Sequence, residues 1–369
     1  MRVTVDAAPL LYRSAGVKNY LYYWIRHLLR EAGGMEIRLF PFLDQPKALD
    51  HDSSGADLFT TVTRLGLMYA LNRIPLGLAR WAGPRPDVFH AAKLKYPPRS
   101  ARLTATVHDL TWRMIPEMHS PANVAAEGAF AERVLRRADG LIAVSEATRA
   151  DAVRILRLAP EKIRVIHHGV AEEFFHAGQA EAEGTRARLG LSRPYALFVG
   201  TIEPRKNVGL LLDAWAGISR SLRDEFDLVV AGPAGWRQRE TLARLSDPTP
   251  GVRYLGYVAE SDLPGLVAGA TVFAYPSLYE GFGFPVAQAM AAGVPVVTSA
   301  VSSLPEIAGD AAALVDPRSQ ADLTRALEDV LTSPERRRGM IERGRANAER
   351  FSWSECARRS ISFFREVAG

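Results

Sequence analysis

The loop Glu280-Gly281-Phe282-Gly283 places a carboxylate and two glycines immediately before a predicted helix. Glycines at this position let backbone N–H groups approach a ligand closely, and the dipole of the helix favours negative charge there. Because the carboxylate of Glu280 would repel a phosphate, it fits a neutral, hydroxyl-rich part of the same ligand. A phosphate joined to a sugar meets both demands. The alternative is that the glycines only shape a turn beside a solvated acid.

A second candidate anion site follows the strand expected at residues 195–200. Arg205 and Lys206 stand close to the start of the next predicted helix, and arginine can bind phosphate oxygens bidentately. Two cations beside a helix N-terminus suit a diphosphate, although most Arg-Lys pairs are only solvated. Both candidate sites follow the carboxyl ends of strands in one predicted sheet, which favours a shared ligand.

Two further groups of side chains are candidates for chemistry. His108 follows the strand expected at residues 103–107, and a histidine there can donate to a hydroxyl or carbonyl of a substrate at neutral pH. A capping or core histidine is the alternative. Asp50 and Asp52 could hold a divalent metal, but aspartates in a serine-rich loop are usually only solvated, and we expect no metal.

The alternation of short buried strands with helical segments predicts the elements that position these residues. Residues 171–193 interrupt the alternation and predict a linker between domains at 1–170 and 194–350. We therefore predict an α/β fold of two doubly wound, Rossmann-like halves that face each other across a cleft. Residues 334–369 predict three helical stretches. The expected strands are residues 3–6, 36–42, 87–90, 103–107, 140–144 and 163–166, then 195–200, 226–231, 252–255, 271–275, 294–298 and 312–315.

Composition limits the class of protein. The chain has 369 residues, of which 24% are charged and 47% apolar, as in soluble globular proteins of about two domains. The single cysteine, Cys356, excludes an internal disulfide. There is no apolar signal segment and no run long enough to span a bilayer, so we expect a cytoplasmic protein.

The first half of the chain is basic, with 24 Lys and Arg against 16 Asp and Glu in residues 1–170. This balance suits an acidic partner, such as an anionic inner-membrane surface, a lipid phosphate or nucleic acid. The segment Leu65–Trp81 could lie on a bilayer, although such segments are more often core-facing helix pairs. Nucleic acid is disfavoured, because the arginines are dispersed and no groove-reading motif is present.

Several motifs together resemble one enzyme family over nearly the whole chain. The chain resembles the retaining glycosyltransferases of family 4, and its GTIEPRKN and SSLPE forms are similar to bacterial surface-polysaccharide enzymes, many of them mannosyltransferases. The resemblance implies the glycosyltransferase B fold, with a C-terminal helix at 351–369 crossing back onto the first domain. It also implies a nucleotide-sugar donor, with GDP-mannose favoured, and a glycan or lipid-linked acceptor. The motifs are YPSLYEGFGFPVAQAMAAGVPVVTS, FVGTIEPRKN, VSSLPEIAGDAAALVDP, AGVKNY and VHDLTW.

The resemblance implies roles for the matching residues. Glu280 would contact hydroxyls of the donor sugar, and His108 would approach the sugar near the reacting carbon. The other implied contacts reach the phosphates, sugar and base of the donor. They are Arg205 and Lys206 on the diphosphate with Gly16 closing over it, the amides of Phe282 and Gly283 in the loop that Gly281 opens, and the backbone of Tyr257 and Val258 at the base.

Two positions depart from the family pattern. Gln288 replaces the acid that normally accepts hydrogen bonds from the ribose, and uncharged acceptors bind more weakly by about 1 kcal/mol. Thr201 stands where an arginine is commoner, so that either Arg205 compensates or donor affinity falls. Gln288 keeps open a noncatalytic nucleotide-sugar-binding partner of another transferase. A nucleotide-sugar epimerase or hydrolase of the same fold is the other alternative.

The expected chemistry is sugar transfer with a nucleoside diphosphate as the leaving group. The resemblance implies retention of configuration. Because no second carboxylate can be placed as a nucleophile, we favour attack from the same face as the departing diphosphate. Positioned cations and amides would stabilise the leaving group without a metal.

Overall fold

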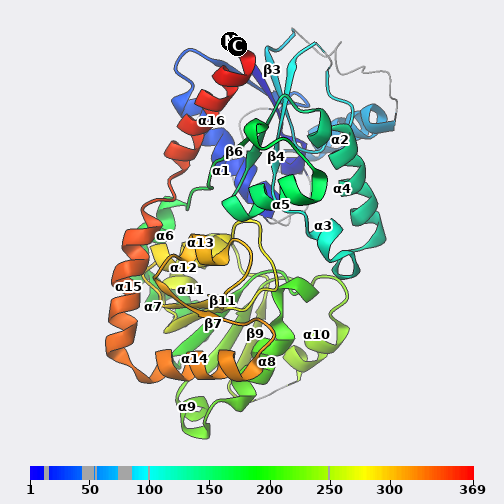
Figure 1. Cartoon of the computed structure of the whole chain (residues 1–369). Helices are drawn as coiled ribbons and strands as arrows, with labels where there is room; N and C mark the ends of the chain where they lie inside the picture. The colour runs from blue at the N-terminus through cyan, green and yellow to red at the C-terminus, as the bar shows by residue number, and fades with distance from the viewer. Residues whose placement is uncertain (12–15, 44–53, 55, 74–84, 99, 248–249) are drawn as a thin grey trace. The chain divides into compact units, whose positions relative to one another are not determined.

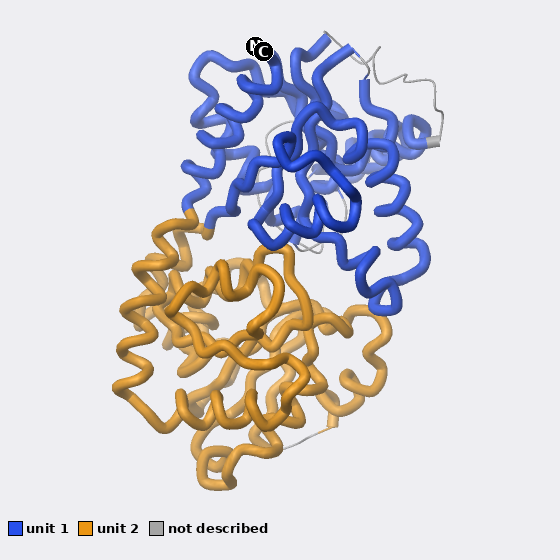
Figure 2. Tube along the Cα trace, viewed as in Figure 1, with its two compact units in different colours: residues 1–169, 352–369 blue, residues 170–351 orange. Residues whose placement is uncertain are grey.

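The computed structural model describes residues 1–11, 16–43, 54, 56–73, 85–98, 100–247 and 250–369. The chain forms two compact units (Figure 2): residues Met1–Gly169 with Ser352–Gly369, and residues Val170–Phe351. Each unit contains its own six-stranded sheet, in which all strand pairs are parallel, together with helices (Figure 1). The predicted α/β fold with two doubly wound halves is confirmed. Asp50, Asp52 and residues 74–81 lie outside the described residues.

The first sheet has the strand order β2-β1-β3-β4-β5-β6, so the order of connection reverses between β1 and β3. The carboxylate of Asp6 is fully buried at this point. It accepts N–H groups from Ala8 and from residues 92–94 at 2.6 to 3.2 Å, which ties the loops after β1 and β3 together. The strands are β1 (Arg2–Asp6), β2 (Glu36–Phe40), β3 (Val88–Ala91), β4 (Arg102–Val107), β5 (Gly140–Ala143) and β6 (Ile163–Val165).

The first unit also contains the helix formed by the last residues of the sequence. In Figure 1 this helix, α16, lies along α1, and Trp24 Nε1 of α1 donates to Ser360 Oγ of α16 at 3.0 Å. A Cβ atom at Gly169 would lie 2.3 Å from the backbone N of Trp353, so only glycine permits this approach. The expected return of the C-terminal helix is confirmed. The helices of the unit are α1 (Gly16–Glu31), α2 (Leu58–Arg73), α3 (Thr111–Met114), α4 (Pro121–Arg133), α5 (Glu146–Leu156) and α16 (Trp353–Ala368), with 3-10 turns η1 (Ala8–Leu11), η3 (Pro116–Met118), η4 (Leu135–Arg137) and η5 (Pro160–Lys162).

The second sheet has the order β12-β11-β10-β7-β8-β9, so its switch point lies between β7 and β10. The strands are β7 (Tyr195–Val199), β8 (Asp227–Ala231), β9 (Val252–Gly256), β10 (Val272–Tyr275), β11 (Val296–Ser299) and β12 (Ala312–Val315). The helices are α6 (Glu172–His176), α7 (Gln179–Arg188), α8 (Val208–Gly217), α9 (Arg220–Glu225), α10 (Arg239–Ser246), α11 (Leu263–Ala268), α12 (Phe284–Ala291), α13 (Leu304–Ala308), α14 (Gln320–Thr332) and α15 (Pro334–Ala348), with the 3-10 turn η6 (Pro204–Lys206).

Two segments differ from the expectation. Residues 171–193, expected as a linker, contain α6 and α7 and belong to the second unit. A Cβ atom at Gly265 of α11 would lie 2.3 Å from Thr185 Oγ1, so α7 packs tightly on α11. Residues 334–369 form two helices, α15 and α16, rather than three, because the chain breaks once, around the buried Phe351. Several strand ends differ from the expected ones by one or two residues.

Candidate functional site

The loops that follow β7 and β10 meet at the switch point of the second sheet. The backbone N of Leu278 donates to the carbonyl of Arg205 at 2.8 Å, and Asn207 Nδ2 donates to the carbonyl of Pro276 at 3.1 Å. Open α/β sheets bind their ligands outside the carboxyl ends of the strands at this point. The two candidate sites of the sequence therefore form one site.

Glu280 lies at the centre of this site and is almost fully buried. Its Oε1 accepts hydrogen bonds from Lys206 Nζ at 2.6 Å, from Ser277 Oγ at 2.6 Å and from the Tyr275 hydroxyl at 3.1 Å. Its Oε2 lies 2.7 Å from Arg205 Nη1. Burial raises the pKa of Glu280, but the two cations and the hydrogen bonds outweigh burial and bring it to about 2. The carboxylate is therefore ionised at neutral pH.

The two cations are both paired within this cluster. Arg205 Nη2 donates to Glu203 Oε1 at 2.6 Å, and Lys206 Nζ donates to the Tyr275 hydroxyl at 2.6 Å. Burial, and next the charge of Arg205, lower the pKa of Lys206, while Glu280 opposes this shift. The cluster of Glu203, Arg205, Lys206 and Glu280 holds two positive and two negative charges. The sequence reasoning did not single out Glu203, although an acid two residues before an arginine was a visible signal.

The glycine loop has the backbone geometry expected of a close approach. Gly283 has φ of +100°, and a Cβ atom there would lie 2.8 Å from Leu304 Cδ2. Gly281 and Phe282 are buried, and Pro285 occupies the first turn of α12. The loop is thus fixed in a conformation that only glycine adopts easily.

Two serines that follow β11 hold the same loop and were not expected as site residues. Ser302 Oγ accepts the backbone N–H of Glu280 at 2.9 Å. Ser303 Oγ lies 2.9 Å from the carbonyl oxygens of both Glu280 and Phe282. These serines belong to the SSLPE stretch, so their position beside Glu280 gives that stretch a physical role.

The remaining expected donor contacts of the second unit lie near the carboxyl ends of strands. Thr201 lies two residues after the end of β7, and Tyr257 and Val258 follow β9, with Tyr257 exposed and Val258 buried. Gln288 is partly buried on α12, and its side chain has no hydrogen-bond partner in the described part of the chain. An amide in this state can accept a hydrogen bond from a ligand.

His108 and Gly16 belong to the first unit. His108 follows β4 directly, and its ring lies edge-on to Tyr20, with centroids 5.0 Å apart, and 5.9 Å from the ring of His168. Burial lowers the pKa of His108, Asp109 opposes this shift and Lys93 adds to it, so that the pKa is about 4. His108 is therefore neutral at pH 7 and can donate from one ring nitrogen. Gly16 is exposed at the start of α1.

The described ranges of the chain contain no group of three or more His, Cys, Asp or Glu that could hold a metal. None of their helices is both long and apolar enough to cross a bilayer.

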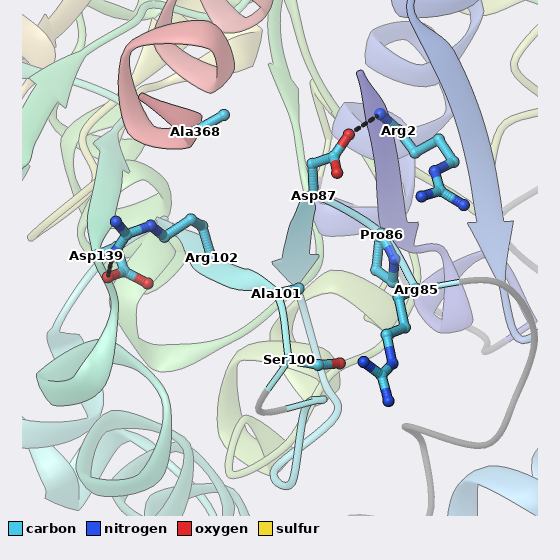
Figure 3. Close-up of a pocket in the computed structure, with 9 residues that line it drawn as sticks. All are labelled: Arg2, Arg85, Pro86, Asp87, Ser100, Ala101, Arg102, Asp139 and Ala368. Carbon is cyan, nitrogen blue, oxygen red and sulfur yellow. Dashed lines mark hydrogen bonds and ion pairs between the residues drawn. The ribbon is translucent and has the colours of Figure 1, made fainter.

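Figure 3 shows a pocket of about 540 Å³ at the amino-terminal ends of β1, β3 and β4 in the first unit. Arg102 pairs with Asp139 there at 3.1 Å, and Asp87 accepts the backbone N–H of Arg2 at 2.7 Å. Parallel sheets bind ligands at the opposite, carboxyl edge. We therefore assign this pocket no part in the site.

Comparison with known proteins places the chain in a family. The sequence model for "Glycosyltransferase Family 4" matches residues 14–174, and that for "Glycosyl transferases group 1" matches residues 183–347. O-antigen chain mannosyltransferase B of Escherichia coli is 30% identical over 99% of this chain and 100% of that protein. D-inositol 3-phosphate glycosyltransferase of Nocardioides sp. is 32% identical over 64% of this chain and 55% of that protein.

Solved structures with low sequence identity share the fold. Sucrose-phosphate synthase from Thermosynechococcus elongatus aligns with a TM-score of 0.73 at 21% identity, covering 100% of this chain and 99% of that chain. WaaG, a glycosyltransferase involved in lipopolysaccharide biosynthesis, aligns with a TM-score of 0.68 at 18% identity, covering 98% and 99%. The chain therefore belongs to the family 4 glycosyltransferases and has their glycosyltransferase B fold.

Proposed function

We propose that this glycosyltransferase moves mannose from GDP-mannose to a hydroxyl of a glycan or lipid-linked acceptor in polysaccharide biosynthesis, with retention of configuration. The observation that carries the proposal is the meeting of Glu280 with Arg205 and Lys206 at the switch point of the second sheet. The choice of mannose is supported by the names of relatives, among them O-antigen chain mannosyltransferase B and the mannosyltransferase WbdA of Escherichia coli.

The donor would bind to the second unit through groups of complementary chemistry. The ionised carboxylate of Glu280 accepts hydrogen bonds from sugar hydroxyls, and the positive end of α12 and the cations favour the diphosphate. The remaining contacts lie at positions that the resemblance implies, although Thr201 and Gln288 differ from the family's usual residues there. They are Thr201 and the Gly281-Phe282-Gly283 loop near the phosphates, Gln288 at the ribose, and the backbone of Tyr257 and Val258 at the base, with Gly16 and His108 contributed by the first unit.

The proposed step forms one bond as another breaks. The acceptor oxygen bonds to the anomeric carbon on the face from which the diphosphate leaves, and the electron pair of the broken carbon–oxygen bond stays on the diphosphate. The acceptor proton passes to an oxygen of that diphosphate. Cations and amides held in place stabilise the developing charge, so that we propose no metal requirement. His108, neutral at pH 7, would donate a hydrogen bond to the sugar.

The test is product analysis of the purified protein with GDP-mannose, UDP-glucose and other nucleotide sugars, with and without glycan and lipid-linked acceptors and with a chelator. We expect a mannosylated acceptor whose anomeric configuration, read by NMR, matches that of the donor. Glu280→Gln should lower kcat/KM about 10- to 100-fold, since it removes one hydrogen bond to a charged group. Glu240→Gln on the exposed surface of α10 is the matched control. A changed sugar without acceptor indicates an epimerase or hydrolase, and an intact donor indicates a binding module.

We further propose a peripheral contact with an anionic membrane surface on the cytoplasmic side. Support comes from the basic first half and from α2, which exposes Leu58, Phe59, Val62 and Tyr69. Sedimentation with phosphatidylglycerol vesicles should retain the protein, and neutral vesicles should not. Phe59→Ser should weaken binding, and Leu314→Ser, at an exposed residue of the second unit, should leave it unchanged.

A further inference from the structure

The guanidinium of Arg205 is held by the protein on two sides. On one side Nη1 donates to the carbonyl of Tyr279 and forms an ion pair with Glu280 Oε2, each at 2.7 Å. On the other side Nη2 donates to Glu203 Oε1 at 2.6 Å, and Glu203 is itself buried. A planar guanidinium has a fixed fork of donors, so two carboxylates on opposite sides fix its position.

The backbone of Arg205 is held as well. Its carbonyl accepts the Ser277 hydroxyl at 3.0 Å and the Leu278 N–H at 2.8 Å. The residue therefore joins η6 to the loop that carries Glu280 through both main chain and side chain. For Arg205 to turn towards a phosphate, it would have to give up its contacts with two buried carboxylates, Glu203 and Glu280, which is costly.

Lys206 is held less completely. Its ammonium has three N–H donors, and the described residues accept two of them, the Tyr275 hydroxyl and Glu280 Oε1. One donor stays available to a ligand without breaking either contact. The flexible stem of lysine also allows a small movement that an arginine between two carboxylates does not have.

The two carboxylate oxygens of Glu280 have different numbers of partners. Oε1 receives three hydrogen bonds, whereas Oε2 has the ion pair with Arg205 Nη1. Each carboxylate oxygen has about two lone-pair sites. Oε2 is therefore the atom with room for a sugar hydroxyl, and Arg205 is the group that orients it.

We propose that Glu203 and Arg205 are positioning residues that aim Glu280 Oε2 at the donor sugar, so that of the two cations that the resemblance assigns to the diphosphate only Lys206 binds it. The inference rests on the proposed function and deepens it, because it separates sugar recognition from phosphate binding within one cluster of four charges. The proposal also gives a reason for the ion pair between Glu203 and Arg205, which lie two residues apart in the sequence. Arg205 then needs no direct contact with the donor.

The test compares the affinity for a nucleoside diphosphate with that for its sugar conjugate, by calorimetry. GDP, UDP, ADP and dTDP are screened on the wild type, and the one that binds is used with its nucleotide sugar. The double variant Glu203→Gln/Arg205→Gln removes the pair without changing the net charge. We expect it to bind the nucleoside diphosphate within about threefold of the wild type but to lose the extra affinity that the sugar confers. Lys206→Gln should weaken both ligands by about tenfold or more.

Each other outcome overturns the proposal in a distinct way. If the double variant loses as much affinity for the nucleoside diphosphate as Lys206→Gln, Arg205 is itself a phosphate ligand. If the increment from the sugar is unchanged, the pair does not aim Glu280. If the wild type binds none of the four diphosphates, the proposed function fails and the inference fails with it. Arg205→Lys keeps the charge but not the fork, so it gives the same test should the double variant not fold.

Discussion

Lys206 Nζ lies 2.6 Å from Glu280 Oε1, and this contact joins the loops after β7 and β10 across residues that are 74 positions apart in the sequence. Both side chains are largely shielded from water, with exposed fractions of 12% and 9%. In this setting we expect the pair and its neighbours to contribute to local stability as well as to the proposed donor binding, and the two effects can be measured separately.

A double-mutant cycle should reveal this coupling. Lys206→Met or Glu280→Gln alone leaves a buried partner incompletely compensated, and should lower the free energy of unfolding of the second unit by about 2–4 kcal/mol. Together they should cost less than the sum, with a coupling of about 1–3 kcal/mol. Urea unfolding, followed for the transition of the second unit, provides the measurement. Additive losses would contradict a direct interaction.

Gln288→Glu should strengthen donor binding. The partly buried amide has no hydrogen-bond partner in the described chain, and a carboxylate at the same place accepts hydrogen bonds more strongly, by about 1 kcal/mol. The Kd of the nucleoside diphosphate should therefore fall about fivefold in calorimetry. Gln179→Glu, which adds the same charge on the exposed start of α7, should change it little. Weaker binding in Gln288→Glu would show that this position does not meet the ribose.

Gly283→Ala should damage both stability and binding. The backbone at Gly283 has φ of +100°, and the added Cβ would lie 2.8 Å from Leu304 Cδ2. We expect a loss of about 1–3 kcal/mol in the free energy of unfolding and weaker nucleotide binding. Gly209→Ala is the control, because that glycine lies within α8 and a Cβ there would meet Thr241 Oγ1 at an ordinary 3.7 Å. Equal melting temperatures for the two variants would argue against strain at Gly283.

Acid should destabilise the first unit before the second. Burial lowers the pKa of His90 to about 3 and of His108 to about 4, and lowers that of His168 well below its usual value. As the pH falls from about 6.5 to about 4, the unfolded chain takes up protons that the folded unit does not, so stability falls over this range.

Glu280 behaves in the opposite way, because its folded pKa of about 2 is below the usual value. Its contribution is complete above about pH 4.5 and is lost as the pH falls towards 2. Denaturant unfolding at a series of pH values checks both statements. His90→Gln should reduce the slope between pH 6.5 and 4. A first unit whose stability is constant over that range would contradict the prediction.

The strand pattern of the sequence predicted both sheets and the edge at which the site lies. Short apolar and aromatic runs followed by Gly200 or Pro276 indicated the carboxyl ends of β7 and β10, so the convergence of Arg205 and Glu280 followed from topology alone. The ion pair between Arg205 and Glu280 did not follow from topology, because it depends on side-chain directions in two loops and on the buried Glu203. The role of Ser302 and Ser303 depends on the same three-dimensional arrangement.

The helix α7 shows why one element was missed. Within Gln179–Arg188 only Ala182 and Thr185 are buried, so the packing face consists of small residues and gives no apolar periodicity. Its packing depends on Gly265 of the partner helix, a residue far away in the sequence. Hydrophobic periodicity identifies helices that bury large apolar side chains. It fails for a helix that packs through small residues lying close to the backbone of its neighbour.

The place of α16 in the first unit has a consequence for biosynthesis. Ribosomes extend the chain from its amino terminus, so residues 352–369 emerge only after the whole second unit has been made. Until then Trp24 on α1 lacks its hydrogen-bond partner Ser360 and its neighbour Phe364. The second unit, which is continuous in sequence, can complete its fold earlier. The amino-terminal unit is thus the last to be finished, and a nascent chain stalled before residue 352 would present an apolar helix face to chaperones.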